Sequence, residues 1–425
     1  MSGSPQLISN RHPLIAAGPG RPLPPLPRTA WVEIDLDALA QNVRVLESML
    51  PDGARLDGVV KADAYGHGAV PVARALVRIG VRSLSVATYD EGLELRQAGI
   101  ELPIFVIYPI PPEFVGPALR HDLAITLGDF TLLERTLAAL AHLTEAAAAR
   151  QLAIHVEVET GLGRGGFDPS DVVAAVAAID AAPRARLAGL WSHLQSGGDL
   201  ALSAAQAKRF GTAAAMLRDA GRTLPRRHIA ASGGLLAASV PSFDVVRVGI
   251  SLYGVVPDGL VASEENLVAV AGLRPLLSLR AKPVRVAALP TGTGVSYGPS
   301  FVTPRPSIIA TLPLGYADGY PRSLSNRAQA LVRGMRVPIV GTVAMDAVMV
   351  DVTDVPGAAV TVDDEFTLIG DQDGETIGVA EVAQWGNTIS HEILTAMSAR
   401  LPRVYYAGAE AVELRTVAFD PDQVR

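Results

Sequence analysis

The sequence of 425 residues contains no cysteine. Disulfides, thiolate metal sites and cysteine nucleophiles are therefore excluded, and the composition fits a cytoplasmic protein. The formal net charge is −7, so the chain lacks the excess of basic residues with which proteins attract nucleic acid or anionic lipid. We therefore expect a small molecule as substrate, and neither nucleic acid nor a membrane as partner.

Long apolar runs are also absent. No segment has the length and hydropathy of a membrane-spanning helix, and the first 28 residues lack the apolar core of a secretory signal. These residues are polar and end in a proline-rich stretch, which predicts a mobile tail over residues 1–28.

Short apolar runs alternate with helical stretches between residues 29 and 270. The first run, 29–37, alternates as a half-buried strand does, and Asp37 is expected to cap the helix that follows. Eight later runs predict buried strands, at residues 58–61, 83–87, 104–107, 123–127, 153–158, 187–192, 228–230 and 245–248. This pattern predicts a (β/α)8 barrel of the α/β class, with its site on the loops after the strands. A doubly wound open sheet would instead require a glycine-rich dinucleotide loop after the first strand, and none is present.

The pattern changes after about residue 270. β-Branched segments cut by turns predict a second, mostly β domain with one late helix near residues 390–398; the segments are 307–313, 329–332, 337–345, 348–352 and 365–369. The predicted organisation is a tail (1–28), a barrel domain (29–270) and a C-terminal β domain (271–425).

A single lysine, Lys61, ends the first barrel run, and Tyr65 follows on the loop. A lysine enclosed by apolar neighbours loses hydration and can titrate low enough to act as an amine nucleophile or Schiff-base partner. An isolated lysine at a strand end more often reaches into solvent, so the hypothesis depends on partners elsewhere in the chain.

Candidate partners lie at other strand ends. Glu157 and Glu159 precede a glycine-rich loop that contains Arg164. If both glutamates pointed into a barrel, two buried carboxylates would need a cation, which Arg164 could supply. The alternative is a solvated strand edge with a flexible turn. His193 ends another strand, where it could stack on a planar ligand or simply fill the core.

The last two barrel strands are followed by residues suited to an anion. Ser232, Gly249 and Ile250 offer a hydroxyl and backbone amides for a phosphate, and Arg247 would point a guanidinium inward. Ordinary glycine turns are an equally simple explanation. In the second domain, Tyr297 is either a turn aromatic or a phenol presented to a neighbouring site.

Together these residues resemble the alanine racemase family, which are pyridoxal-phosphate enzymes of fold type III, from about Thr29 to about Tyr405. Residues 61–68 (KADAYGHG) are similar to the family's cofactor-lysine signature, and segments 243–254, 295–298, 315–319, 345–346 and 400–403 follow in the family's order. Several separated motifs in one order make a specific signal.

The resemblance implies a homodimer with shared active sites that racemises a small amino acid, L-alanine to D-alanine, for peptidoglycan precursors. Lys61 would be the base on the D face of the α-carbon, and Tyr297 of the partner subunit the base on the L face. The implied cofactor is pyridoxal 5′-phosphate, and no metal is expected. The cofactor would contact Lys61, Tyr65, Arg164, His193, Ser232, Arg247, Gly249, Ile250 and His391, and the substrate would contact Arg164, Met345 and Asp346.

The chain departs from the family at several positions. Glu157 stands where many members have a lysine that becomes carbamylated, and we predict that this glutamate holds Arg164 directly. Ala231 replaces a common asparagine, Thr342 an arginine of the entrance corridor, and His391 a tyrosine. These changes leave open a different or broader substrate range, such as serine.

Three alternatives fit less of the sequence. A pyridoxal-phosphate decarboxylase of this fold would use a cysteine, and the chain has none. A non-catalytic pyridoxal-phosphate carrier would need neither the second domain nor Tyr297. A barrel enzyme could use Glu157 and Glu159 as an acid–base pair. That hypothesis gives no common role to Lys61 and Arg247.

Overall fold

The computed structural model describes residues 21–143 and 150–418. The described residues form two compact units: unit 1 contains those within 1–39, 66–68 and 275–425, and unit 2 contains those within 40–65 and 69–274. Most of the predicted tail, residues 1–20, lies outside the described residues. Among the residues that are described, no helix has the length and hydropathy to cross a membrane.

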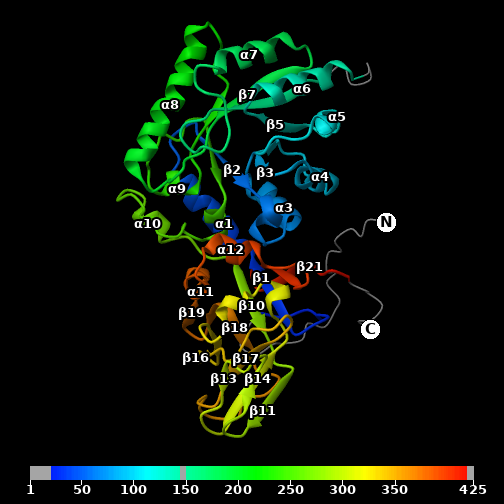
Figure 1. The fold of residues 1–425 in the computed structure, drawn as a ribbon, viewed down its shortest axis with the longest axis vertical. Coiled ribbons are helices and arrows are strands. Elements are labelled where there is room, and N and C mark those ends of the chain that lie inside the picture. Colours follow the sequence, from blue (N-terminus) through cyan, green and yellow to red (C-terminus); the bar gives the residue numbers. More distant parts are fainter. Residues whose placement is uncertain (1–20, 144–149, 419–425) are drawn as a thin grey trace. The chain divides into compact units, whose positions relative to one another are not determined.

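Unit 2 is built on a parallel eight-stranded sheet in the order β8-β7-β6-β5-β4-β3-β2-β9 (Figure 1). A parallel bridge between Ala231, which follows β8, and Arg247 on β9 joins the two outer strands, which closes the barrel. Each strand overlaps one of the eight predicted runs: β2 (Arg55–Val59), β3 (Leu84–Val86), β4 (Ile104–Val106), β5 (Leu123–Leu127), β6 (Leu152–Glu157), β7 (Ala185–Trp191), β8 (Arg226–His228) and β9 (Val245–Val248). The predicted barrel is confirmed.

Helices follow the barrel strands in the chain. They are α3 (Ala69–Ile79), α4 (Tyr89–Gln97), α5 (Val115–Arg120), α6 (Phe130–Ala141), α7 (Val172–Ala181), α8 (Leu200–Asp219), α9 (Ser232–Leu236) and α10 (Leu267–Val270), with short 3-10 turns η1 (Pro112–Phe114) and η3 (Ile250–Tyr253). Aspartates begin two of these helices: Asp129 accepts from the amide of Leu132 on α6, and Asp199 from that of Leu202 on α8, both at 2.9 Å. Such caps satisfy amides that a helix start leaves unpaired.

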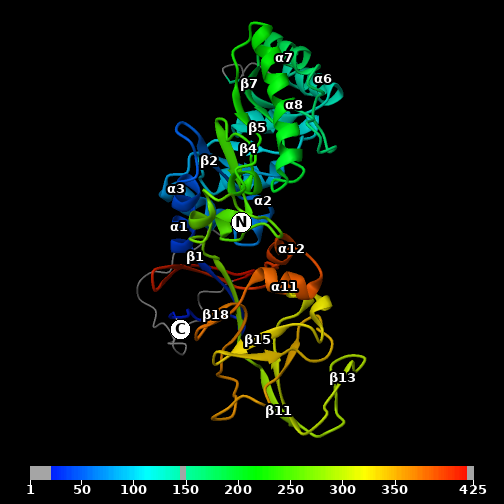
Figure 2. The ribbon, with the colours of Figure 1, turned by 90° about the vertical axis from the view of Figure 1, so that its left-hand side faces the viewer.

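Unit 1 is mostly β, as predicted. Its largest sheet has the order β16-β15-β18-β10-β1-β20-β21, with β19 paired to β18, and β11-β14-β17 and β12-β13 form smaller sheets. Figure 2 labels β1, β15 and β18 of the largest sheet. The strands are β1 (Ala30–Asp35), β10 (Leu277–Ala281), β11 (Arg285–Leu289), β12 (Gly294–Val295), β13 (Phe301–Val302), β14 (Ser307–Leu312), β15 (Gln329–Val332), β16 (Met335–Pro338), β17 (Val348–Asp351), β18 (Phe366–Gln372), β19 (Glu375–Ile377), β20 (Arg403–Ala407) and β21 (Glu410–Arg415). Its helical elements are η4 (Tyr316–Asp318), η5 (Arg322–Leu324), α11 (Val379–Gly386) and α12 (Ser390–Thr395). Helix α1 (Leu36–Glu47) contains the point where the chain passes from unit 1 to unit 2.

The first strand differs from expectation. β1 pairs antiparallel with β10 and parallel with β20, so residues 30–35 belong to the sheet of unit 1 and not to the predicted barrel domain 29–270. The cap of α1 is also different from the predicted Asp37. Asp35 accepts from the amide of Ala38 at 2.9 Å, whereas Asp37 accepts from the amide of Gly408.

Two further expectations are corrected in unit 1. Residues 21–28 are not a mobile tail, because Arg28 donates to the buried Asp318 at 2.6 Å and Leu23 packs against the Trp31 cluster. The run 337–345 is not one strand, because β16 ends at Pro338 and Gly341 then turns the chain with a φ of 77°.

Candidate functional site

Lys61 directly follows β2 and opens a left-handed turn, α2 (Lys61–Tyr65). Ala62, Asp63 and Ala64 have φ values of 53°, 53° and 54°. For residues other than glycine this conformation costs about 1–2 kcal/mol each. Strain of this kind is kept where the surrounding structure enforces it, which is common at functional sites.

Two carboxylates support the left-handed turn. Glu91 on α4 accepts from the amide of Ala62 at 2.6 Å, and the side chain of Asp63 accepts from the amide of Ala69 at 2.8 Å. The turn is therefore hydrogen-bonded to the first turn of α4 and to the start of α3.

Tyr65, at the end of this turn, lies against Gly249, the residue after β9. A Cβ atom at Gly249 would be 2.4 Å from the Tyr65 hydroxyl oxygen, so a larger residue there would displace the phenol. Burial raises the pKa of Tyr65 to about 12, which keeps its phenol a hydrogen-bond donor at neutral pH.

The backbone after β9 forms a cradle of donors with these side chains. The amides of Gly249 and Ser251 point at the Ser232 hydroxyl oxygen, at 3.2 and 3.5 Å. Two amides, a serine hydroxyl and the Tyr65 phenol thus meet at the ends of β8 and β9. This donor set matches a phosphate group.

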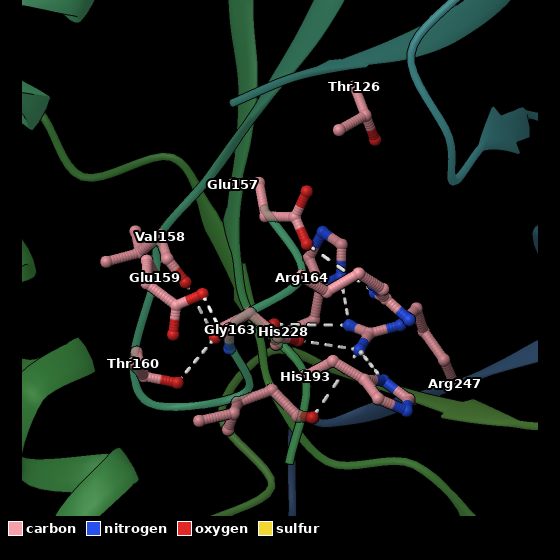
Figure 3. A network of polar contacts seen from close by, with 12 residues as sticks. Thr126, Glu157, Val158, Glu159, Thr160, Gly163, Arg164, His193, His228 and Arg247 are labelled. Atoms are coloured by element: carbon pink, nitrogen blue, oxygen red, sulfur yellow. Dashed lines mark hydrogen bonds and ion pairs between the residues drawn. The ribbon is translucent and has the colours of Figure 1, made fainter. Parts of the chain in front are cut away.

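Arg247 on β9 is a buried cation, 3% exposed. Its Nη1 donates to Nδ1 of His228 at 2.6 Å, and its Nη2 donates to the carbonyl of Ser192 at 2.7 Å and to Nδ1 of His193 at 3.2 Å (Figure 3). Because a guanidinium has no acceptor, both Nδ1 atoms must accept, and each imidazole carries its proton on Nε2.

The chain of imidazoles continues from His228 to His155. The Nε2 atom of His228 lies 2.8 Å from Nδ1 of His155, so His228 donates and His155 also has its proton on Nε2. Gly189 makes room for this bond, because a Cβ atom there would lie 2.2 Å from Nδ1 of His155.

All three histidines are neutral. Burial, and then the charge of Arg247, lower the pKa of His155 and of His193 to about 3 and that of His228 well below its usual value. Burial lowers the pKa of Arg247 to about 10, which leaves it a cation at neutral pH.

The amine of Lys61 is also perturbed. Burial is the main cause of its lowered pKa, and the charge of Arg164 adds to this, while Glu91 acts in the opposite direction. The free amine is therefore more populated than in an exposed lysine, as a proton acceptor or nucleophile requires.

Arg164 and Glu157 form an ion pair at 3.5 Å between Nη2 and Oε1 (Figure 3). Burial raises the pKa of Glu157, and Arg164 opposes this only in part. Glu159 differs from expectation: its carboxylate accepts from the amides of Gly161 and Gly163 and so caps the loop, instead of entering the barrel beside Glu157. β6 ends at Glu157, so strand alternation does not reach Glu159.

The other predicted site residues belong to unit 1. Tyr297 lies on the loop between β12 and β13 and is 76% exposed, and Met345 is 51% exposed. Asp346 accepts from Arg400 at 2.6 Å, and His391 lies half-buried on α12.

The sequence interpretation missed Glu91, Asp57, His155 and His228. Asp57 accepts from the hydroxyls of Ser83 and Ser85, and its charge favours the cationic form of Arg247. Asp57 and His155 are polar residues within mostly apolar strands, β2 and β6, and His228 opens the apolar run 228–230, which was the available signal.

The neutral histidines give a prediction that can be tested by nitrogen-15 NMR of histidine side chains. His155, His193 and His228 are expected to show the Nε2–H tautomer and no titration between pH 5 and 8. Since the unfolded chain takes up protons near pH 6.5 and the folded chain does not, stability should fall as pH decreases below about 6.5. A charged imidazole at any of the three positions at pH 6 would contradict this.

The chain is similar to proteins of one family along most of its length. Residues 34–257 match the family model of the alanine racemase N-terminal domain, and residues 276–405 that of the alanine racemase C-terminal domain. The alanine racemase of Halothermothrix orenii is 38% identical over 382 residues, which cover 89% of this chain and 97% of that protein.

Solved structures agree with the sequence comparison. The alanine racemase of Clostridium difficile matches with a TM-score of 0.85 and 28% identity, over 93% of this chain and 100% of that one. That of Bacillus anthracis, with bound L-Ala-P, matches with a TM-score of 0.83 and 32% identity, over 92% and 98%. That of Streptomyces lavendulae has a TM-score of 0.80 and 37% identity, over 90% and 98%. The chain therefore belongs to the alanine racemase family.

Proposed function

We propose that the protein racemises alanine with pyridoxal 5′-phosphate. The observation that carries this proposal is the grouping, in one barrel, of a lysine with a lowered pKa, a buried arginine and a phosphate-type donor cradle. The residues fit the cofactor. Ser232, Tyr65 and the backbone at 249–251 suit its phosphate, Arg247 and His193 suit its ring, and Lys61 suits its aldehyde.

When bound, pyridoxal phosphate supplies an electron sink that acidifies the α-carbon of an amino acid. Lys61 then accepts or returns a proton at Nζ, on one face of that carbon. Burial and the charge of Arg164 favour the free amine needed for this role.

Arg247 would face the cofactor ring as a hydrogen-bond donor that keeps its own proton. Its pKa of about 10 is still far above neutrality. The neutral imidazoles at its Nη1 and Nη2 atoms have no proton to pass on through Nδ1, because both Nδ1 atoms accept. Arg247 would thus give the cofactor ring a hydrogen bond and a nearby positive charge, but it would not protonate the ring.

The second base in this proposal is Tyr297 of the partner subunit. Its 76% exposure leaves the phenol uncovered in its own chain, as a residue donated to another copy must be. We therefore propose a homodimer with shared sites. We place it in the cytoplasm, where it would supply D-alanine for peptidoglycan precursors. The L-Ala-P bound to the Bacillus anthracis relative supports alanine as the substrate.

Lys61 can be tested directly because the chain has only three lysines, Lys61, Lys208 and Lys282. After incubation with pyridoxal phosphate and borohydride reduction, peptide mass spectrometry should find the label on Lys61, with the exposed Lys208 as an internal control. The loaded protein should form D-alanine from L-alanine, and Lys61→Ala should do neither. Equal labelling of the three lysines would contradict the cofactor site, and a loaded wild type inert toward a panel of L-amino acids would contradict racemisation.

The Tyr297→Phe variant tests the second base. Because it removes only the phenolic oxygen of an exposed residue, the fold should persist, while turnover from L to D should fall by roughly a hundredfold or more. Solvent deuterium exchange at the α-carbon should continue from the Lys61 face. Unchanged racemisation would exclude Tyr297 as a base.

Glu157 gives a third prediction. Its carboxylate holds Arg164 without a carbamate, so activity should not respond to removal or addition of bicarbonate. Glu157→Gln should lower kcat/KM by about tenfold, because a charge-assisted interaction contributes about 1.5 kcal/mol or more. Activity that rises with bicarbonate in the wild type would show that Glu157 does not replace the family's carbamylated lysine.

A further inference from the structure

Arg164 has a second neighbour besides Glu157. The ring of Tyr108 faces its guanidinium, with 5.2 Å between Cζ and the ring centroid. This is the separation of a cation–π pair. Within residues 21–143 and 150–418, the Glu157 ion pair and this ring contact are the polar and ring interactions of the Arg164 side chain.

Tyr108 is anchored to the barrel through its backbone. It follows β4, and the amides of Ile107 and Tyr108 donate to the carbonyls of Val86 and Ala87 at 2.9 and 3.2 Å. These bonds extend the pairing between β3 and β4 by two residues. Tyr108 is 43% exposed, so packing in the hydrophobic core does not explain an aromatic residue at this position.

The loop that carries Arg164 needs such a support. Gly161, Gly163 and Gly166 all have positive φ, at 134°, 71° and 112°, and a loop rich in glycine loses much conformational entropy when it is fixed. The Glu157–Arg164 distance of 3.5 Å exceeds the 2.7–2.9 Å typical of a charge-assisted hydrogen bond. The carboxylate alone therefore positions the guanidinium only weakly.

We propose that Tyr108 is a positioning residue for Arg164: its ring holds one side of the guanidinium from the β4 loop, while Glu157 holds it from β6. The contact of Tyr108 with Arg164 does not depend on the proposed function. Only the effect of Arg164 on the cofactor and the substrate rests on that function. The two supports differ in chemistry, since one is an ion pair and the other an aromatic face.

The two supports should respond differently to pH. Protonation of Glu157 abolishes its ion pair. Arg164 and Arg247 favour the ionised carboxylate, whereas burial and Glu159 favour the protonated one. The aromatic face does not change with pH. The position of Arg164 therefore depends more on Tyr108 as Glu157 becomes protonated.

A double-mutant cycle tests the shared hold. In the loaded enzyme, Tyr108→Ala should lower kcat/KM by about fivefold, while Tyr108→Phe, which keeps the ring, should stay near wild type. Tyr108→Ala combined with Glu157→Gln should lose more than the product of the two single losses, because both act on Arg164. The defect of Tyr108→Ala should also grow as pH falls through the titration of Glu157.

A readout independent of turnover separates this inference from the proposed function. Reductive methylation with carbon-13 labels the three lysines of the cofactor-free protein, and NMR then follows each titration. Release of Arg164 in Tyr108→Ala should raise the pKa of Lys61 and leave Lys208 and Lys282 unchanged, with Tyr108→Phe like wild type.

Two results would overturn the role of Tyr108. One is an unchanged Lys61 titration together with purely multiplicative kinetic losses in the cycle. The other is a Tyr108→Phe variant as impaired as Tyr108→Ala, which would assign the effect to the hydroxyl. A wild type without racemase activity whose Lys61 titration still responds to Tyr108→Ala would refute the proposed function and leave this inference standing.

Discussion

The buried charge of Arg247 determines how the polar groups around it in the barrel must be arranged. An unpaired buried guanidinium would be strongly unfavourable, so its neighbours must be acceptors. The carbonyl of Ser192 and the Nδ1 atoms of His228 and His193 meet this requirement directly. Asp57 and Glu157 favour the cation from further away. One donor-only side chain thereby fixes the tautomers of the imidazoles around it and, through His228, that of His155.

This constraint also limits which groups in the site can change charge near neutral pH. The histidines remain neutral, and Tyr65 and Arg247 keep their protons. Beside the Arg164 guanidinium, burial lowers the pKa of Lys61 and raises that of Glu157. Both are influenced by Arg164, so the placement of that guanidinium influences the proton affinity of the site.

The barrel was predictable from the sequence because buried parallel strands are short apolar runs, and eight such runs were separated by helices. The positions of Lys61, Arg164, His193 and Arg247 at or near strand ends were predictable for the same reason. The partner sheet of β1 was not, because alternation shows that one face is buried but not against which strands. Nor did proline content reveal that Leu23 and Arg28 make tertiary contacts.

The left-handed turn after Lys61 was beyond the reach of sequence rules. Positive φ is expected at glycine or asparagine, and residues 62–65 are Ala-Asp-Ala-Tyr. Tertiary contacts impose this conformation, through acceptors such as Glu91 that lie far along the chain. Patterns of local preference do not contain such contacts.

Glu91 connects two barrel loops mechanically. One carboxylate oxygen accepts from Ala62 after β2, and the other accepts from Ala87 and Thr88 after β3. The two loops are thus clamped to a single rigid group at the start of α4. A bulky ligand that displaced the loop after β3 would also displace the backbone next to Lys61. The fit of a ligand against the β3 loop would therefore affect the position of the Lys61 amine.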